Sequence, residues 1–233
     1  MDTVPYNFVD AVIDLFPQRT LKRPLAENVN NTIWKDVIQL HYYNRRYFNV
    51  YIAEVDDRFQ IVFEREGSPE RATIQELRQV AGRYLRFIRV CNSYGEDEDD
   101  KVLYLQKDDQ KTLRQMLSPA FAVSGARLSI GRTSGAAQKW IMEGLFKKIY
   151  FHELNVPYIE TIAEEFLKDQ IEKSPVLRGI NLLHDGPWPL SILPYLKKFL
   201  LQTGMKSRTF KQCGSHRINV EKKLDTAYKP RKP

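Results

Sequence analysis

The hydrophobic positions near the beginning of the chain repeat with the period of an α-helix. Within residues 6–16, Phe8, Val12 and Phe16 stand at i, i+4 and i+8, a spacing that places them on one helix face. Pro17 cannot continue a helix and marks its end. The pattern predicts an amphipathic helix whose apolar face needs a covering surface.

A second helix is predicted a short distance downstream. Asn31 and Thr32 both suit the N-cap position, and the apolar residues that follow, Trp34 among them, continue with helical spacing to Leu40. The two helices together define a small helical unit, which we assign to residues 1–45.

The pattern changes to that of β-strands immediately after this unit. Residues 47–55 and 59–63 are rich in β-branched and aromatic side chains, and the polar triplet at 56–58 separates them. Two such runs around a short polar turn predict a β-hairpin, which would begin a second domain at residues 46–204.

Short strands and short helices alternate over the rest of that domain. Strands are predicted at 85–90, 101–105, 127–130, 148–151 and 178–183, with a weaker one at 208–212, and helices at 74–81, 110–117, 136–145, 158–171 and 190–201. Because a strand followed by a covering helix favours a parallel sheet, we predict an α/β fold. It would comprise the helical N-terminal unit, the β-hairpin and a βα-alternating sheet.

The predicted strands resemble one another, which indicates a degenerate repeat. Their apolar residues tend to occupy relative positions 1, 4 and 6, as Leu177, Ile180 and Leu182 do, and this pattern resembles the core of a leucine-rich repeat. The intervals between successive repeats range from 21 to 40 residues. Two interpretations therefore stay open: an irregular leucine-rich-repeat-like sheet, or a βα-alternating domain without a solenoid.

The N-terminal unit resembles the F-box family. An F-box begins with a Leu-Pro pair, and apolar residues follow the proline at fixed offsets. Here Val4-Pro5 stands at that place, and Val12, Phe16 and Leu21 follow Pro5 after 7, 11 and 16 positions. A tryptophan follows in both cases. The resemblance implies that this unit is a divergent F-box.

The F-box resemblance implies a protein partner. In that family the apolar surface inserts into the Skp adaptor of an SCF ubiquitin ligase, and a repeat-like C-terminal domain recruits the substrate. The partner-binding residues would be Val4, Pro5, Phe8, Val12, Phe16, Leu21 and Trp34. Each large side chain removed from water contributes roughly 1.5–3 kcal/mol before ordering costs. The alternative is that these helices only cap the α/β domain, as terminal helices do in repeat proteins.

Most of the chain also resembles a large nematode family of F-box-like proteins. The similarity is carried by residues 4–12, 34–41 and 177–182, and by Trp188-Pro189. It implies a non-catalytic adaptor whose C-terminal domain binds an unknown target protein. The candidate aromatic anchors for that target are Trp140, Trp188 and Tyr195.

The net charge of +7 comes from the end of the chain. Residues 206–232 contain nine basic and two acidic residues, a difference that equals the charge of the whole protein. The neutral remainder argues against a nucleic-acid-binding domain. We assign residues 205–233 to a basic tail. It would be solvated, or contact an acidic partner or nucleic acid, or carry a nuclear signal at 229–232.

Composition argues against several other classes of protein. With 42% hydrophobic and 28% charged residues, the chain can form a core, and it lacks the roughly 18–20 consecutive apolar residues of a membrane span. Asp2, Asp10 and Asp14 interrupt any secretory signal. Cys91 and Cys213 are too far apart for a disulfide framework, so we expect reduced thiols in the cytoplasm or nucleus.

The sequence has no convincing catalytic or metal-binding pattern. The four histidines are isolated and lack the spacing of metal ligands. His184 follows a predicted strand, where an α/β active site can lie, and the backbone amides of loop 131–135 could hold a phosphate. That loop matches neither a P-loop nor a nucleophile elbow, and Ser134 as a helix N-cap accounts for it. We expect no enzymatic activity, no cofactor and no metal.

Overall fold

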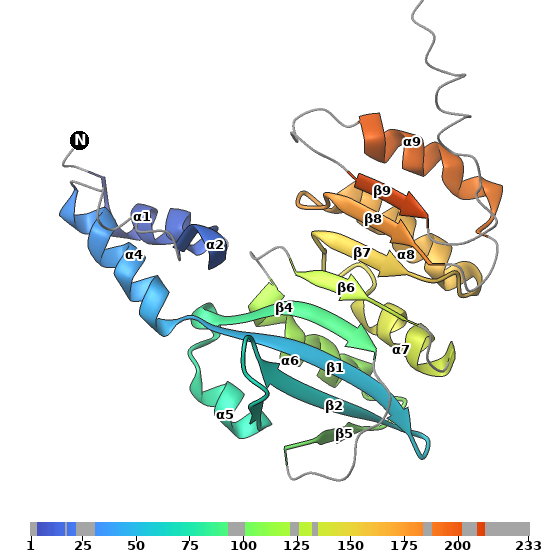
Figure 1. Ribbon diagram of the computed structural model, residues 1–233, viewed down its shortest axis with the longest axis horizontal. Coiled ribbons are helices and arrows are strands. Elements are labelled where there is room, and N and C mark those ends of the chain that lie inside the picture. The colour runs from blue at the N-terminus through green and yellow to red at the C-terminus, as the bar shows by residue number, and fades with distance from the viewer. Residues whose placement is uncertain are drawn as a thin grey trace, which may run out of the picture.

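The chain folds as a helical unit followed by a twisted sheet with helices behind it (Figure 1). The computed structural model describes residues 4–16, 18–21, 31–92, 101–121, 126–131, 135–183, 188–201 and 209–212. The predicted α/β class is confirmed, including the helical N-terminus, the hairpin and the alternating elements.

Three described helices form the N-terminal unit. They are α1 (Tyr6–Asp14), α2 (Gln18–Leu21) and α4 (Thr32–Asn44). Of the two predicted caps, Asn31 occupies the N-cap of α4. Its side-chain oxygen accepts hydrogen bonds from the backbone N–H groups of Ile33 at 3.1 Å and Trp34 at 3.4 Å. A single residue, Arg45, separates α4 from the first strand, so no flexible linker joins the unit to the sheet.

The predicted hairpin is confirmed. Its strands are β1 (Arg46–Val55) and β2 (Arg58–Arg65), which pair antiparallel. The two turn residues, Asp56 and Asp57, have φ angles of 48° and 59°. A tight hairpin turn needs positive φ at both central positions, and aspartate tolerates this conformation better than most residues.

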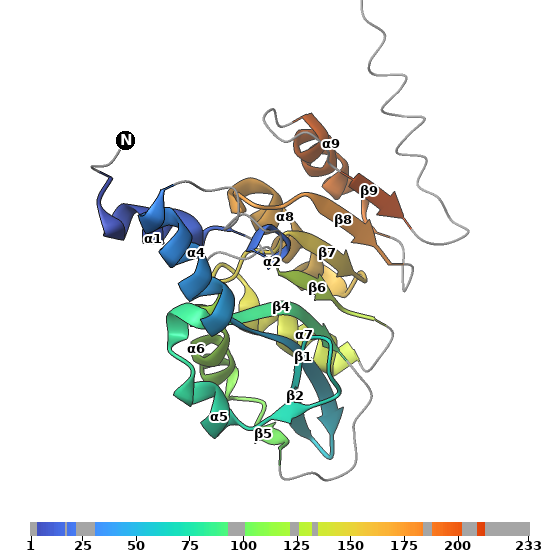
Figure 2. The ribbon, with the colours of Figure 1, turned by 60° about the vertical axis from the view of Figure 1, so that its left-hand side comes forward.

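The parallel strands add to the sheet in the order in which they occur in the chain, whereas β3 and β5 pair with the hairpin. The remaining elements are β3 (Arg71–Ala72), α5 (Ile74–Gln79), η1 (Gly82–Tyr84), β4 (Leu85–Asn92), β5 (Leu103–Leu105), α6 (Gln110–Phe121), β6 (Arg127–Ser129), α7 (Gly135–Leu145), β7 (Glu153–Val156), α8 (Glu160–Lys173), β8 (Gly179–Leu182), η2 (Leu190–Ile192), α9 (Leu193–Leu201) and β9 (Thr209–Gln212). From β1 the order is β4, β6, β7, β8 and β9, all parallel, while β3 and β5 pair with β2. Helices α6 to α9 contact one another in the same sequence, as in a stacked βα repeat (Figures 1 and 2).

The register of the parallel strands shows a more regular repeat than the sequence suggests. Val90, Leu128, Leu154 and Ile180 are direct neighbours across four strands, and all four are buried. Successive members are 38, 26 and 26 residues apart. The two shorter intervals lie within the roughly 20–29 residues of leucine-rich repeats. From β6 to β8 the interval between aligned residues is therefore constant at 26 residues, and only the interval from β4 to β6 is longer.

The strand predicted at 148–151 is wrong, because β7 begins only at Glu153. The side chain of Gln170 on α8 supplies hydrogen bonds to the predicted segment in place of a neighbouring strand. Its amide nitrogen donates to the carbonyl oxygen of Ile149 at 2.7 Å, and its oxygen accepts from the N–H of Phe151 at 3.0 Å. Ile149 and Phe151 are buried like strand residues, which explains the misleading pattern.

The weak strand predicted at 208–212 is present as β9, which pairs parallel with β8. It lies inside the range 205–233 that we assigned to the basic tail, so the sheet extends into that range. The rest of that range lies outside the described residues. Outside them too are Pro17, Ser134, His184 and Cys213.

Replacing Gln170 by methionine should lower the free energy of unfolding by about 2–4 kcal/mol. The substitution keeps the side-chain volume but leaves a buried donor and a buried acceptor without partners, each at about 1–3 kcal/mol. Urea unfolding measures the change. Gln39→Met, at an exposed position of α4, is the matched control and should be close to neutral. Equal stability of the two variants would contradict this role of Gln170.

Candidate protein-docking site

The N-terminal unit has a small hydrophobic core of its own. Val9 and Ile13 of α1 and Val37 and Ile38 of α4 are buried together with Leu21. This cluster is separate from the main core, which the sheet and helices α6 to α9 share. Among the described residues, the unit thus has a hydrophobic cluster distinct from that of the main domain.

Helix α1 has three different faces. One faces the small core, and a second carries Asp10 and Asp14 toward the sheet. The third carries Phe8, Val12 and Leu15 at i, i+4 and i+7, so that they follow one another along the helix. Phe8 is 57% exposed, Leu15 is 63% exposed, and Val12 is half-buried between them. We call these three residues the outer strip.

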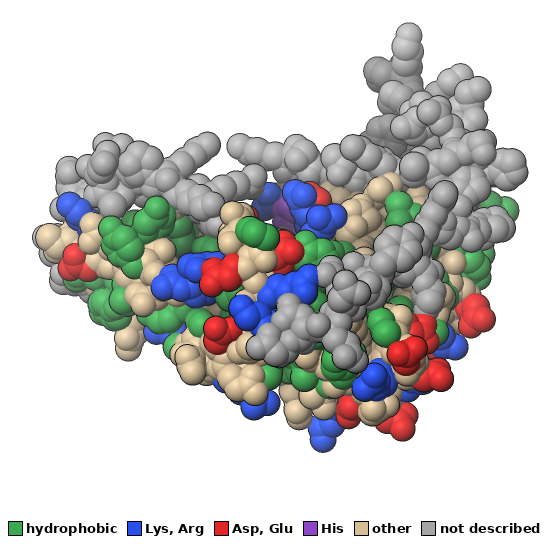
Figure 3. All heavy atoms as spheres, turned by 60° about the horizontal axis from the view of Figure 1, so that its bottom comes forward, with side chains coloured by type: hydrophobic (Ala, Val, Ile, Leu, Met, Phe, Trp, Pro, Cys, Tyr) green, Lys and Arg blue, Asp and Glu red, His purple; other side chains and the backbone are tan. Residues whose placement is uncertain are grey.

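Exposed apolar side chains are concentrated on this unit. Of the eight large hydrophobic residues that are exposed in the described parts of the chain, six belong to it: Tyr6, Phe8, Leu15, Leu40, Tyr42 and Tyr43. Figure 3 shows hydrophobic side chains, in green, at the left of the molecule, where Figure 1 places α1 and α4. Such a concentration is typical of a protein interaction surface.

The seven residues predicted to bind a partner have different environments. Pro5 and Phe8 are exposed, whereas Leu21 is buried in the small core. Leu15, which the sequence did not single out, is exposed beside Phe8. The remaining four are half-buried: Val4, Val12, Phe16 and Trp34.

The three aromatic residues proposed as target anchors lie on the main domain, and two of them are buried. Trp140 stacks on Phe59 with the ring centroids 4.1 Å apart, and Trp188 is 3% exposed. Tyr195 is half-buried, and the ammonium group of Lys168 lies over its ring. The rings of Trp140 and Trp188 thus belong to the core, while Tyr195 is partly accessible.

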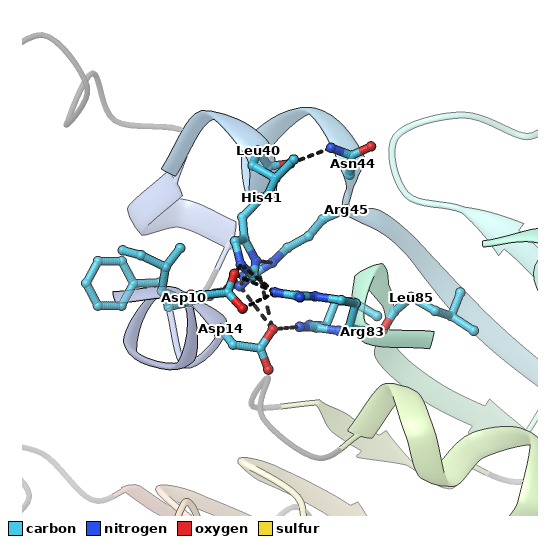
Figure 4. Close-up of polar contacts among 11 residues, drawn as sticks. Asp10, Asp14, Leu40, His41, Asn44, Arg45, Arg83 and Leu85 are labelled. Carbon is cyan, nitrogen blue, oxygen red and sulfur yellow. Dashed lines mark hydrogen bonds and ion pairs between the residues drawn. The ribbon is translucent and has the colours of Figure 1, made fainter. Parts of the chain in front are cut away.

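A cluster of polar and charged side chains joins the helical unit to the sheet (Figure 4). It is made of three pairs: Asp10 and Asp14 on α1, His41 and Arg45 at the end of α4, and Arg83 and Arg86 at η1 and the start of β4. Arg83 donates to both carboxylate oxygens of Asp10, and Arg86 donates to Asp14. We call these six residues the junction.

The spacing within the junction also fixes how the two long helices lie. Asp10 is paired with His41, and Asp14 lies 3.7 Å from Arg45. Residues four positions apart lie on the same helix face, so both pairs form together only if α1 and α4 run in the same direction.

His41 is fully buried within the junction. Its Nε2 lies 3.0 Å from Oδ1 of Asp10, and its Nδ1 lies 3.2 Å from Nε and 3.0 Å from Nη2 of Arg45. Arginine nitrogens only donate, so Nδ1 accepts and the N–H is on Nε2. Burial lowers the pKa of His41, and so does the positive charge of Arg45. The hydrogen bond to Asp10 raises the pKa, but not enough to return it to its ordinary value. The ring is therefore neutral at neutral pH.

Arg45, the residue that follows α4, caps the C-terminal end of α1 with its side chain. Its Nη1 donates to the carbonyl oxygen of Phe16 at 2.6 Å, and its Nη2 donates to that of Ile13 at 2.8 Å. Carbonyl groups at a helix C-terminus lack intrahelical partners and carry partial negative charge, which a buried guanidinium satisfies. The side chain is 1% exposed, so these bonds are shielded from water.

The charges of the junction depend on one another. Burial acts to raise the pKa of Asp10, but hydrogen bonds from Arg83 and His41 outweigh it and hold the pKa below its ordinary value. Burial and the charge of Arg45 lower the pKa of Arg86, whose Nε is buried without a partner among the described residues. Removing a carboxylate would leave a buried arginine without its counter-charge, which is costly.

The residues of the junction were not among the candidates predicted from the sequence. The available signal was the spacing of four residues between Asp10 and Asp14 and between His41 and Arg45, which places each pair on one helix face. Their partner Arg86 lies 72 residues beyond Asp14, so no local pattern could identify it.

Other candidate chemistry finds little support in the described residues. Where the structure is described, no group of three or more potential ligands could hold a metal ion. None of the described helices combines the length and the apolar character that crossing a membrane requires. Burial raises the pKa of Cys91 to about 11, so its thiol stays protonated. Residues 132–134 of the loop considered for phosphate lie outside the described residues.

Comparison with known proteins finds no relative of this chain. No family model matches it, and no curated protein or solved structure is significantly similar to it. The functional interpretation therefore starts from the outer strip and the junction.

Replacing Arg45 by methionine should lower the free energy of unfolding by about 3 kcal/mol. The change removes the hydrogen bonds to Ile13, Phe16 and His41 and one of the charges near Asp14. Arg46→Met, at the next and exposed position, is the control and should cost less than about 1 kcal/mol. Thermal unfolding with hydrogen exchange of the α1 amides measures both, and equal protection of α1 in the two variants would contradict the role of Arg45.

The stability of the protein should fall as the pH drops below about 6.5. The pKa of His41 is lowered from an ordinary value of 6.5, so the unfolded chain binds a proton that the folded chain does not bind. The contribution of His41 is therefore complete above that pH and is lost progressively below it. Urea unfolding at pH 7.5, 6.5 and 5.5 measures the slope. His41→Gln should show a smaller slope, and identical slopes would refute the assignment.

Proposed function

We propose that this protein is a non-catalytic adaptor of an SCF-type ubiquitin ligase. Its N-terminal unit docks on a Skp-type adaptor, and its sheet domain presents a target protein. The observation that carries the proposal is the outer strip: Phe8 and Leu15 are exposed on a unit that already has a hydrophobic core. The F-box resemblance around Pro5 supports the choice of partner.

Docking through the outer strip needs no rearrangement of the unit. Phe8 and Leu15 are accessible while Val9 and Ile13 stay in the small core. Burying a large apolar side chain contributes roughly 1.5–3 kcal/mol, and a few central residues supply most of the affinity of an interface. Pro5 is exposed at the N-cap of α1, next to the strip, which is consistent with a contact at the beginning of the helix.

The junction gives such an adaptor a defined geometry. A ligase adaptor has to hold its target at a fixed place relative to the rest of the complex. Only Arg45 separates α4 from β1, and its buried side chain also binds the end of α1. The orientation of the docking surface relative to the sheet is therefore set by several directional hydrogen bonds instead of by a flexible linker.

A second candidate function is an α/β interaction domain without a role in ubiquitination. It is favoured by the environment of Leu21, Phe16 and Trp34, which are turned at least partly into the small core although the F-box pattern assigns them to the partner. In that case the helical unit stabilises the end of the sheet next to η1 and β4. The two candidates differ in whether the outer strip binds a Skp-type protein.

Titration calorimetry with a purified Skp-type adaptor tests the proposal. The wild-type chain should bind, and a Phe8→Ala, Leu15→Ala double variant should bind at least about tenfold more weakly, because both side chains would be central in the interface. The control is a Leu190→Ala, Leu201→Ala double variant. It removes the two large hydrophobic side chains that are exposed outside the N-terminal unit in the described residues, and its affinity should be unchanged.

Circular dichroism of both double variants checks that the fold is retained. Binding by neither the wild type nor the control would favour the second candidate. Equal affinities of the two double variants would show that a different surface is responsible, and the outer strip would lose its assigned role.

A further inference from the structure

A cleft lies on the main domain between helices α5 and α6. Its volume is about 350 Å³. The floor is formed by Phe63 of β2 and by Leu85 and Phe87 of β4, all of which are buried. Leu77 of α5 and Met116 of α6 line the two sides. Figure 2 shows both helices near the lower left end of the sheet.

The lining of the cleft combines an apolar interior with a few polar groups. Besides the residues above, Ile74 and Val80 contribute apolar surface, while Thr112 and Gln115 of α6 contribute a hydroxyl and an amide. Arg78 is the one charged residue among the described residues that line the cleft. An apolar cavity with a small number of polar groups is the usual form of a small-molecule site, and its volume lies at the lower end of the roughly 300–1,000 Å³ of such sites.

Arg78 has an exposed side chain and forms no ion pair with a described residue. The acid closest to it in sequence, Glu76, is already engaged. Its carboxylate accepts a hydrogen bond from the backbone N–H of Thr73 at 2.7 Å and another from the Thr73 hydroxyl at 3.1 Å, which form the capping box of α5. The guanidinium group of Arg78 is thus available to an external anion.

We propose that this cleft binds a small hydrophobic carboxylic acid, with its hydrocarbon part over Phe63, Leu85 and Phe87 and its carboxylate at Arg78. A guanidinium matches a carboxylate in a planar, two-bond geometry. The hydroxyl of Thr112 or the amide of Gln115 can donate a further hydrogen bond. A dianionic phosphate fits less well, since Arg78 is the only cation among the described lining residues.

The size of the cleft limits the length of the ligand. A volume of about 350 Å³ accommodates a medium-length alkyl chain or one aromatic ring, and it is too small for an amphipathic helix of a protein partner. The cleft shares no residue with the outer strip or the six residues of the junction. This inference therefore stands apart from the adaptor role and can fail or succeed independently of it.

Binding of sodium octanoate to the full chain tests the proposal. Titration calorimetry should show saturable binding at concentrations below micelle formation. 1-Octanol, the uncharged counterpart, should bind about fivefold more weakly, and acetate, the head group alone, should not bind measurably.

Three variants separate the contributions of charge and volume. Arg78→Gln should weaken octanoate binding about fivefold and leave 1-octanol binding unchanged. Met116→Trp, which fills the cleft, should weaken binding of both by at least about tenfold. Arg89→Gln removes another exposed arginine that does not line the cleft, and it should have no effect.

A readout on the wild-type chain covers the case in which a variant does not fold. Octanoate should shift the methyl NMR signals of Leu77 and Met116 with the same dissociation constant as calorimetry gives. Absence of saturable binding would overturn the proposal. So would octanoate binding that neither Arg78→Gln nor Met116→Trp weakens, or shifts confined to residues outside the cleft.

Discussion

The hydrogen bonds and ion pairs of the junction, in which the side chains of His41, Arg45 and Arg86 are buried, set the position of the N-terminal unit. Asp10 accepts hydrogen bonds from Arg83, and Asp14 accepts one from Arg86. The neutral ring of His41 is hydrogen-bonded to Asp10 on one side and to Arg45 on the other. Buried ion pairs contribute little net stability, because desolvation offsets most of their attraction. Their hydrogen bonds are directional, however, so the network defines one orientation. This orientation also fixes where the exposed apolar face of the unit lies relative to the sheet.

The sheet provides the second constraint. Strands β6, β7 and β8 are added in chain order, and the helices that follow them, α7, α8 and α9, contact one another in the same order, so each repeat packs on the one before it. The 26-residue step between Leu128, Leu154 and Ile180 keeps one buried row continuous across the strands. At the other end of the sheet, a cleft lies between α5 and α6, next to the buried side chains of Phe63 and Phe87.

The sequence predicted the fold well and the candidate site only in part. The helical spacing of the first forty residues, the cap at Asn31 and the polar turn at 56–58 are local signals, and all three agree with the structure. The strand at 148–151 was misplaced because Gln170, distant in sequence, satisfies its backbone groups. Trp140 was proposed as an anchor, but residue type alone does not distinguish an exposed ring from a buried one.

Most of the elements and their order can be read from local sequence, because helix and strand formation depends on the period of apolar residues and on caps and turns within a few positions. The same period also places Phe8 on an apolar helix face. The packing of the elements against one another sets which part of that face is buried, and it brings Asp14 to Arg86 and Arg78 to the rim of an apolar cleft. These relations join residues far apart in the chain, and they arise from the packing of whole elements, which no local pattern encodes.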